Sequence, residues 1–62
     1  MTTEEMLIRL TEARDFAQGV IWTLQNAGDR YLELLYDARQ LLASCEVGLT
    51  SLRDAAVREN DQ

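Results

Sequence analysis

Apolar residues recur through the N-terminal half of the chain at alternating steps of four and three residues. This spacing keeps their side chains on one face of a helix and forms a heptad seam of a and d positions. Leu7 and Ile21 fall at position e and Phe16 at position g. These flanks widen the seam to the breadth typical of a helix bundle. The seam consists of Met6, Leu10, Ala13, Ala17, Val20, Leu24 and Ala27.

A second series with its own register runs through the C-terminal half. Leu34, Leu41 and Ala55 fall at position g beside this series, while the opposite side of the segment is polar. The pattern therefore predicts a second amphipathic helix with a broad apolar face. Its seam consists of Tyr31, Leu35, Ala38, Leu42, Cys45, Leu49, Leu52 and Ala56.

Local signals mark the ends of these helices. Thr2 and Glu5 have the spacing of a capping box, which begins a helix. Gly28 can take the left-handed conformation that ends a helix, and Asp29 can cap the next one. We therefore predict an all-α antiparallel hairpin in one domain over residues 1–62, with a helix at about 3–27, a turn at about 28–29 and a helix at about 30–59.

Two other arrangements fit parts of the pattern. The heptad phase can be carried through Gly28, which would give one helix about 90 Å long. The Gly28–Asp29 pair would cost such a helix about 1.5 kcal/mol in propensity. Alternatively, Gly48 could break the second helix and Thr50 could cap a third. The seam runs through Gly48 unbroken, which favours a glycine at a close approach of two helices.

The chain is short for a stable monomer. A domain of 62 residues buries only about 60% of its unfolded surface, and small folds usually need disulfides, a metal or oligomerisation. Cys45 is the only cysteine and histidine is absent, so oligomerisation is the option that remains. We expect Cys45 to be a buried core thiol, with an intermolecular disulfide as the alternative.

An isolated hairpin would leave the flanking apolar side chains in water, at roughly 1.5–3 kcal/mol each. Pairing two hairpins into a four-helix bundle would cover these flanks, so we predict a homodimer. The predicted oligomer interface consists of Leu7, Leu10, Phe16, Ala17, Ile21, Leu24, Leu34, Leu35, Leu41, Leu42, Cys45, Leu49 and Leu52.

This layout resembles the Rop-type plasmid regulators, which are hairpins of similar length that dimerise antiparallel. The resemblance is one of architecture, since no run of residues matches, and no RNA-binding residue is carried over. The RNA-binding function of these regulators is not carried over either, and an RNA-binding regulator of this kind is an alternative hypothesis. A purely structural oligomerisation element is a further alternative.

The residues that carry most enzyme chemistry are missing. Histidine and lysine are absent, and the three glycines are too scattered for a phosphate-binding loop. Cys45 has no histidine to activate it. We therefore expect a protein that is not an enzyme, with no catalytic residues, no metal and no cofactor.

Charge and hydropathy indicate which partners and which cellular compartment to expect. The net charge of −5 argues against general nucleic-acid binding, which depends on neutralising phosphates. No apolar run reaches the roughly 18 residues of a membrane span, and the N-terminal residues lack the positive charge of a signal peptide. We expect a cytoplasmic protein, of bacterial or phage origin, that does not contact a membrane.

Several large apolar residues lie away from the seams. Trp22 and Ile8 fall at position f of the first helix and Tyr36 at position b of the second. Tryptophan is enriched among binding hot spots, so these three are the candidate partner-binding residues. The alternative is that Trp22 packs on a neighbouring turn. The favoured function is a homo-oligomeric helical regulator, adaptor or inhibitor that binds another protein.

Overall fold

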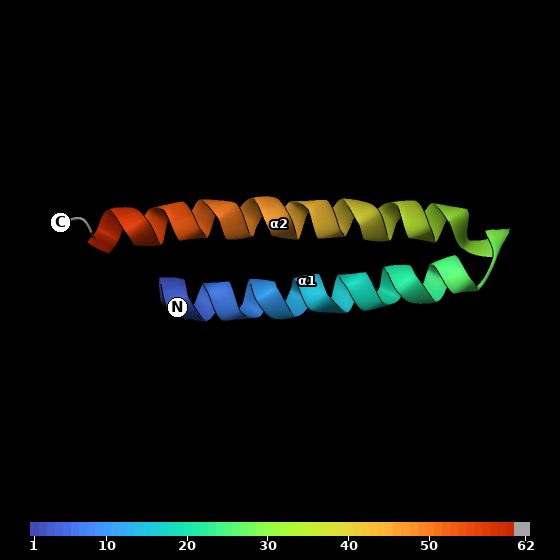
Figure 1. The fold of residues 1–62 in the computed structure, drawn as a ribbon, viewed down its shortest axis with the longest axis horizontal. Coiled ribbons are helices and arrows are strands. Elements are labelled where there is room, and N and C mark those ends of the chain that lie inside the picture. The colour runs from blue at the N-terminus through green and yellow to red at the C-terminus, as the bar shows by residue number, and fades with distance from the viewer. Residues whose placement is uncertain (61–62) are drawn as a thin grey trace.

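The computed structural model describes residues 1–60 as a hairpin of two long helices. Helix α1 spans Thr3–Asn26, a 3-10 helix η1 spans Asp29–Tyr31, and α2 spans Leu32–Asn60. The long helices run antiparallel, side by side, in a rod of 51 × 15 × 14 Å (Figure 1). The predicted all-α hairpin is confirmed.

Helix α1 begins at its predicted cap. Thr2 has extended backbone angles, and its hydroxyl oxygen accepts a hydrogen bond from the Glu5 N–H at 3.1 Å. This bond satisfies one of the donors that the first helical turn leaves free. Glu4 and Glu5 add negative charge where the helix dipole favours it.

The chain reverses at Gly28. Its φ of 84° and ψ of −160° lie in a region that glycine adopts without strain, and no other residue in 1–60 has a positive φ. The alternative of one continuous helix is therefore wrong. The prediction that Asp29 caps the second helix is also wrong, because Gly28 holds the cap position and Asp29 begins η1. This 3-10 turn delays α2 until Leu32.

The core is a single seam between the two helices. Its buried members are Ala17, Leu35, Ala38, Cys45 and Leu49. Cys45 is a free thiol that is only 5% exposed, which confirms the predicted buried cysteine. Two predicted seam members, Ala27 and Tyr31, are exposed, because both lie at the chain reversal where the helices no longer face each other.

Helix α2 runs through Gly48 without a break, so the predicted alternative of a third helix is wrong. A Cβ at Gly48 would lie 3.2 Å from Leu10 Cδ1, which confirms that this glycine marks a close approach of the helices. The Thr50 hydroxyl donates to the Glu46 carbonyl oxygen one turn earlier at 3.1 Å. Thr50 is thus an interior helical residue and not a cap.

Candidate interaction surface

Two contacts define the register of the hairpin. Gly48 lies against Leu10, and near the termini the Thr3 hydroxyl donates to the Glu59 carboxylate at 3.3 Å. Counting along both helices from the Gly48–Leu10 contact places Phe16 level with Leu41, within about one residue rise of 1.5 Å. The same count places Leu24 level with Leu34.

The hairpin has two long edges, one on each side of the seam. A surface hollow lined by Leu7, Thr11 and Arg53 shows which sides of α1 and α2 share one edge. At 3.6 residues per turn, Ile21 of α1 falls on this same edge. We call it the covered edge and define it by Leu7, Thr11, Arg14 and Ile21 of α1 with Arg53 of α2.

The opposite edge brings together side chains that the seam leaves out. Helical geometry places Phe16 and Gly19 of α1 there, beside Leu34 and Leu41 of α2. We call it the apolar edge and define it by Phe16, Gly19, Val20, Thr23, Leu34 and Leu41.

Exposure distinguishes the two edges. Phe16, Leu34 and Leu41 are 74%, 54% and 53% exposed. Leu7 and Ile21 were predicted to be left exposed in a single hairpin as well, but both are half-buried. The apolar edge therefore presents three large exposed side chains from both helices, whereas on the covered edge Leu7 and Ile21 are half-buried and Leu32 is exposed near the turn.

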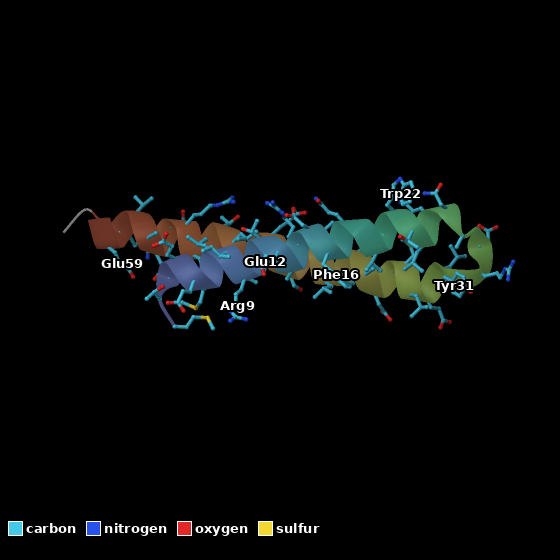
Figure 2. All side chains as sticks on the ribbon, turned by 90° about the horizontal axis from the view of Figure 1, so that it is seen from below. Arg9, Glu12, Phe16, Trp22, Tyr31 and Glu59 are labelled. Carbon is cyan, nitrogen blue, oxygen red and sulfur yellow. The ribbon has the colours of Figure 1, made fainter. Side chains whose placement is uncertain are left out.

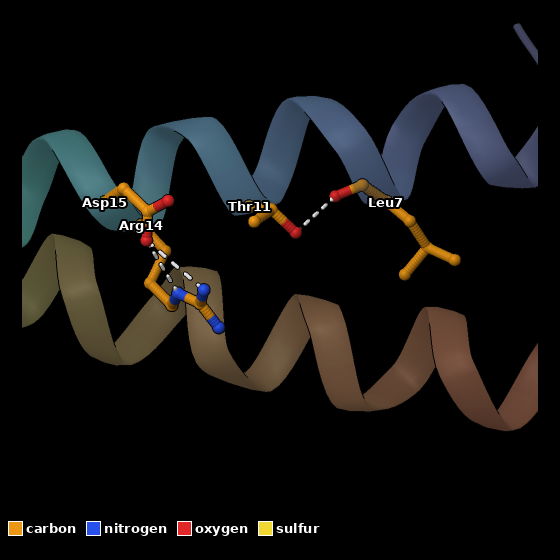
Figure 3. Close-up of polar contacts among 4 residues, drawn as sticks. All are labelled: Leu7, Thr11, Arg14 and Asp15. Atoms are coloured by element: carbon orange, nitrogen blue, oxygen red, sulfur yellow. Dashed lines mark hydrogen bonds and ion pairs between the residues drawn. The ribbon is translucent and has the colours of Figure 1, made fainter.

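Local polar contacts within α1 lie along the covered edge (Figure 3). The half-buried Thr11 donates its hydroxyl hydrogen to the Leu7 carbonyl oxygen at 2.8 Å. The Arg14 guanidinium pairs with Asp15 at 3.2 Å, and the Arg14 side chain is only 29% exposed. Most of the Arg14 side chain is thus removed from water while its charged end is paired.

A hollow of about 400 Å³ lies on α1 at the apolar edge. Phe16, Gly19, Val20 and Thr23 line it together with Leu24. The first four are spaced as i, i+3, i+4 and i+7, the set that surrounds an inserted side chain in knobs-into-holes packing. A Cβ at Gly19 would meet nothing within 4 Å, so the missing side chain leaves the centre of the hollow open.

The lining of this hollow needs no polar partner. Its only side-chain polar group, the Thr23 hydroxyl, already donates to the Gly19 carbonyl oxygen at 2.9 Å. An entering apolar side chain would therefore leave no side-chain donor unsatisfied. The heptad pattern did not indicate the contribution of Gly19 and Thr23. The i, i+3, i+4, i+7 pattern around a glycine is the signal that could have revealed it.

The three candidate partner-binding residues are all exposed, and Ile8 lies far from Trp22 along the rod. Trp22, Tyr36 and Ile8 are 67%, 63% and 53% exposed, so Trp22 is not covered by a neighbouring turn. Figure 2 shows Trp22 on the opposite long side of the rod from Arg9. Ile8 lies about 21 Å away along the same helix. Tyr36 belongs to the other helix, α2.

Within residues 1–60, no three Asp, Glu or Cys side chains gather into a set that could hold a metal ion. Neither described helix is long and apolar enough to cross a membrane. Comparisons with protein-family models, curated proteins and solved structures found no match to this chain.

Proposed function

We propose that this protein is a small, non-enzymatic interaction protein that acts as a homodimer and binds another protein as a regulator, adaptor or inhibitor. The apolar edge is the observation that carries the proposal. Phe16, Leu34 and Leu41 remain more than half exposed on a hairpin whose core is one seam. A second hairpin laid on this edge would complete a four-helix bundle.

The surface area supports association. A compact monomer of 7.1 kDa exposes about 4,100 Å². This hairpin exposes 4959 Å², an excess of roughly 900 Å². A standard protein interface buries about 800 Å² on each partner. Burying one edge against another hairpin would therefore bring the surface per chain close to the value of a compact protein.

Trp22 supports the proposal that the dimer binds another protein. It is 67% exposed and is not among the residues that line the hollow on the apolar edge. Large aromatic side chains contribute much of the binding energy in protein interfaces. The outward side of α1 around Trp22 is therefore the proposed contact for a partner protein.

The homodimer is tested by sedimentation equilibrium over the micromolar range, combined with circular dichroism. We expect a helical species of twice the chain mass. A helical species of single mass throughout that range would refute the proposal.

Partner binding is tested by comparing Trp22→Ala with Val47→Ala, because both positions are about two-thirds exposed. We expect both variants to remain dimeric, with only Trp22→Ala losing a partner that mass spectrometry identifies in pull-downs from the source organism. Equal capture by wild type and Trp22→Ala would remove Trp22 from the proposal. A gel shift with RNA that weakens steeply with salt would instead favour the RNA-binding alternative.

A further inference from the structure

We propose that the second copy docks on the apolar edge with both hairpin turns at the same end of the bundle, so that Leu41 of each copy enters the hollow on α1 of the other. This inference rests on the proposed homodimer and assigns its interface and topology. It differs from the antiparallel arrangement of the Rop-type regulators.

The hollow on α1 and the exposed leucines of α2 have matching shapes. The hollow is centred on Gly19, where no side chain fills the space between Phe16 and Thr23. Leu34 and Leu41 are spaced as repeating knobs, one heptad apart, and both are about half exposed. Each copy therefore carries a hole on α1 and knobs on α2. Two copies related by a twofold axis can use both sets, as a symmetric dimer interface requires.

The apolar surface also occupies only one half of the rod. The hollow and both leucines lie in the half of the hairpin nearer the turn. In the other half, the same side of α1 carries Glu5, Arg9 and Glu12, which line a shallow hollow with Ile8. Arg9 falls on the same side of α1 as Phe16 because the two are seven residues apart.

The apolar and charged positions favour one of two topologies, in which the hairpin turns lie either at the same end or at opposite ends of the bundle. With the turns at opposite ends, the apolar half of one hairpin would cover the charged half of the other. Glu12 and Arg9 would then lose water without a matching partner, which is unfavourable. With the turns at the same end, apolar surface meets apolar surface over its whole length.

The same-end topology also brings knobs and holes to one level. Its twofold axis runs along the rod, so α1 of one copy faces α2 of the other. Within one hairpin Phe16 is level with Leu41, and Leu24 with Leu34, so each hollow meets the leucines of the second copy. The opposite-end topology would instead place α1 against α1 and α2 against α2, so the leucines of one copy could not reach the hollow on α1 of the other.

Filling the hollow tests the docking site. In Gly19→Leu the new side chain enters open space in the single hairpin, and replacing glycine raises helix propensity. We expect the monomer to become more helical while the dimer Kd rises at least about 100-fold, because the hollow is blocked. Opposite signs for these two effects cannot come from misfolding. An unchanged Kd would overturn the assignment of the hollow.

Removing the knob gives a second test with a matched control. Leu41→Glu places charge at the proposed contact, whereas Val47→Glu makes the same kind of change at an exposed position of α2 outside the apolar edge. We expect at least about a 100-fold increase in Kd for Leu41→Glu and little change for Val47→Glu. Equal effects of the two variants would contradict the proposal.

Disulfide trapping tests the topology in otherwise intact dimers. Two variants are prepared on a Cys45→Ala background, one with Thr23→Cys and one with Leu34→Cys. The same-end topology brings these positions together between copies, within the short Cα separation that a disulfide needs. We expect a crosslinked dimer when the two variants are mixed and oxidised, and none from either variant alone. A mixture that remains uncrosslinked, or a variant that crosslinks with itself, would overturn the same-end topology.

The outcomes separate the inference from the proposed function. A monomeric wild-type chain would refute the homodimer and the interface together. A wild-type dimer that survives Gly19→Leu and Leu41→Glu would leave the proposed function standing and refute only the interface assigned to it.

Discussion

The two long edges of the hairpin flank the same seam, yet their apolar side chains are buried to different extents. On the covered edge Leu7 and Ile21 are half-buried, and Arg14 lies beside them with its charge paired to Asp15. On the apolar edge Phe16 and Leu34 are 74% and 54% exposed, and a hollow opens beside them.

Two adjacent leucines in α2 show how the difference arises. Leu35 is 9% exposed, while its neighbour Leu34 is 54% exposed. Successive helical residues point about 100° apart, so one neighbouring helix can bury only one leucine of such a pair. Leu41 and Leu42 repeat the arrangement one heptad later, with Leu42 the more buried of the two. The exposed leucine of each pair, Leu34 or Leu41, needs another helix to cover it.

The seam that supports both edges should be the most sensitive part of the molecule. Leu49 is 1% exposed, and removing a buried leucine side chain typically costs about 2–5 kcal/mol. In a hairpin with so small a core, we expect Leu49→Ala to remove most of the helical signal in circular dichroism. A variant as stable as wild type in urea would show that the seam is not the main source of stability.

The edges themselves should respond differently to alanine. Ile21→Ala removes packing inside one chain, so we expect it to lower the free energy of unfolding by about 1–2 kcal/mol at every protein concentration. Phe16→Ala should destabilise only at concentrations where the wild type is dimeric. Urea unfolding at low and high protein concentration measures both effects. The same concentration dependence in both variants would erase the distinction between the edges.

The smallest effect is expected at the polar contact of the covered edge. Arg14→Ala removes the ion pair with Asp15. A surface ion pair contributes about 0–1 kcal/mol to the free energy of unfolding. We expect a loss near the middle of that range, reduced in high salt, with no change in dimer Kd. A large rise in Kd would show that this edge also takes part in association.

Sequence patterns predicted the features that depend on nearby residues. The cap at Thr2 and the reversal at Gly28 were both predictable, because capping and backbone preferences act within a few residues. The role of Asp29 was not, since the chain inserts a 3-10 turn before α2. Tyr31 continued the heptad pattern but is exposed, because a repeat cannot show where two helices stop facing each other.

The sequence by itself determined two helices, one glycine turn and one apolar seam, because these follow from helix periodicity and local backbone energies. Only the tertiary structure decided which flank of the seam stays open. That choice depends on which side of each helix faces its single neighbour. In this orientation Leu35 is buried, Leu34 is exposed and the space above Gly19 is unfilled.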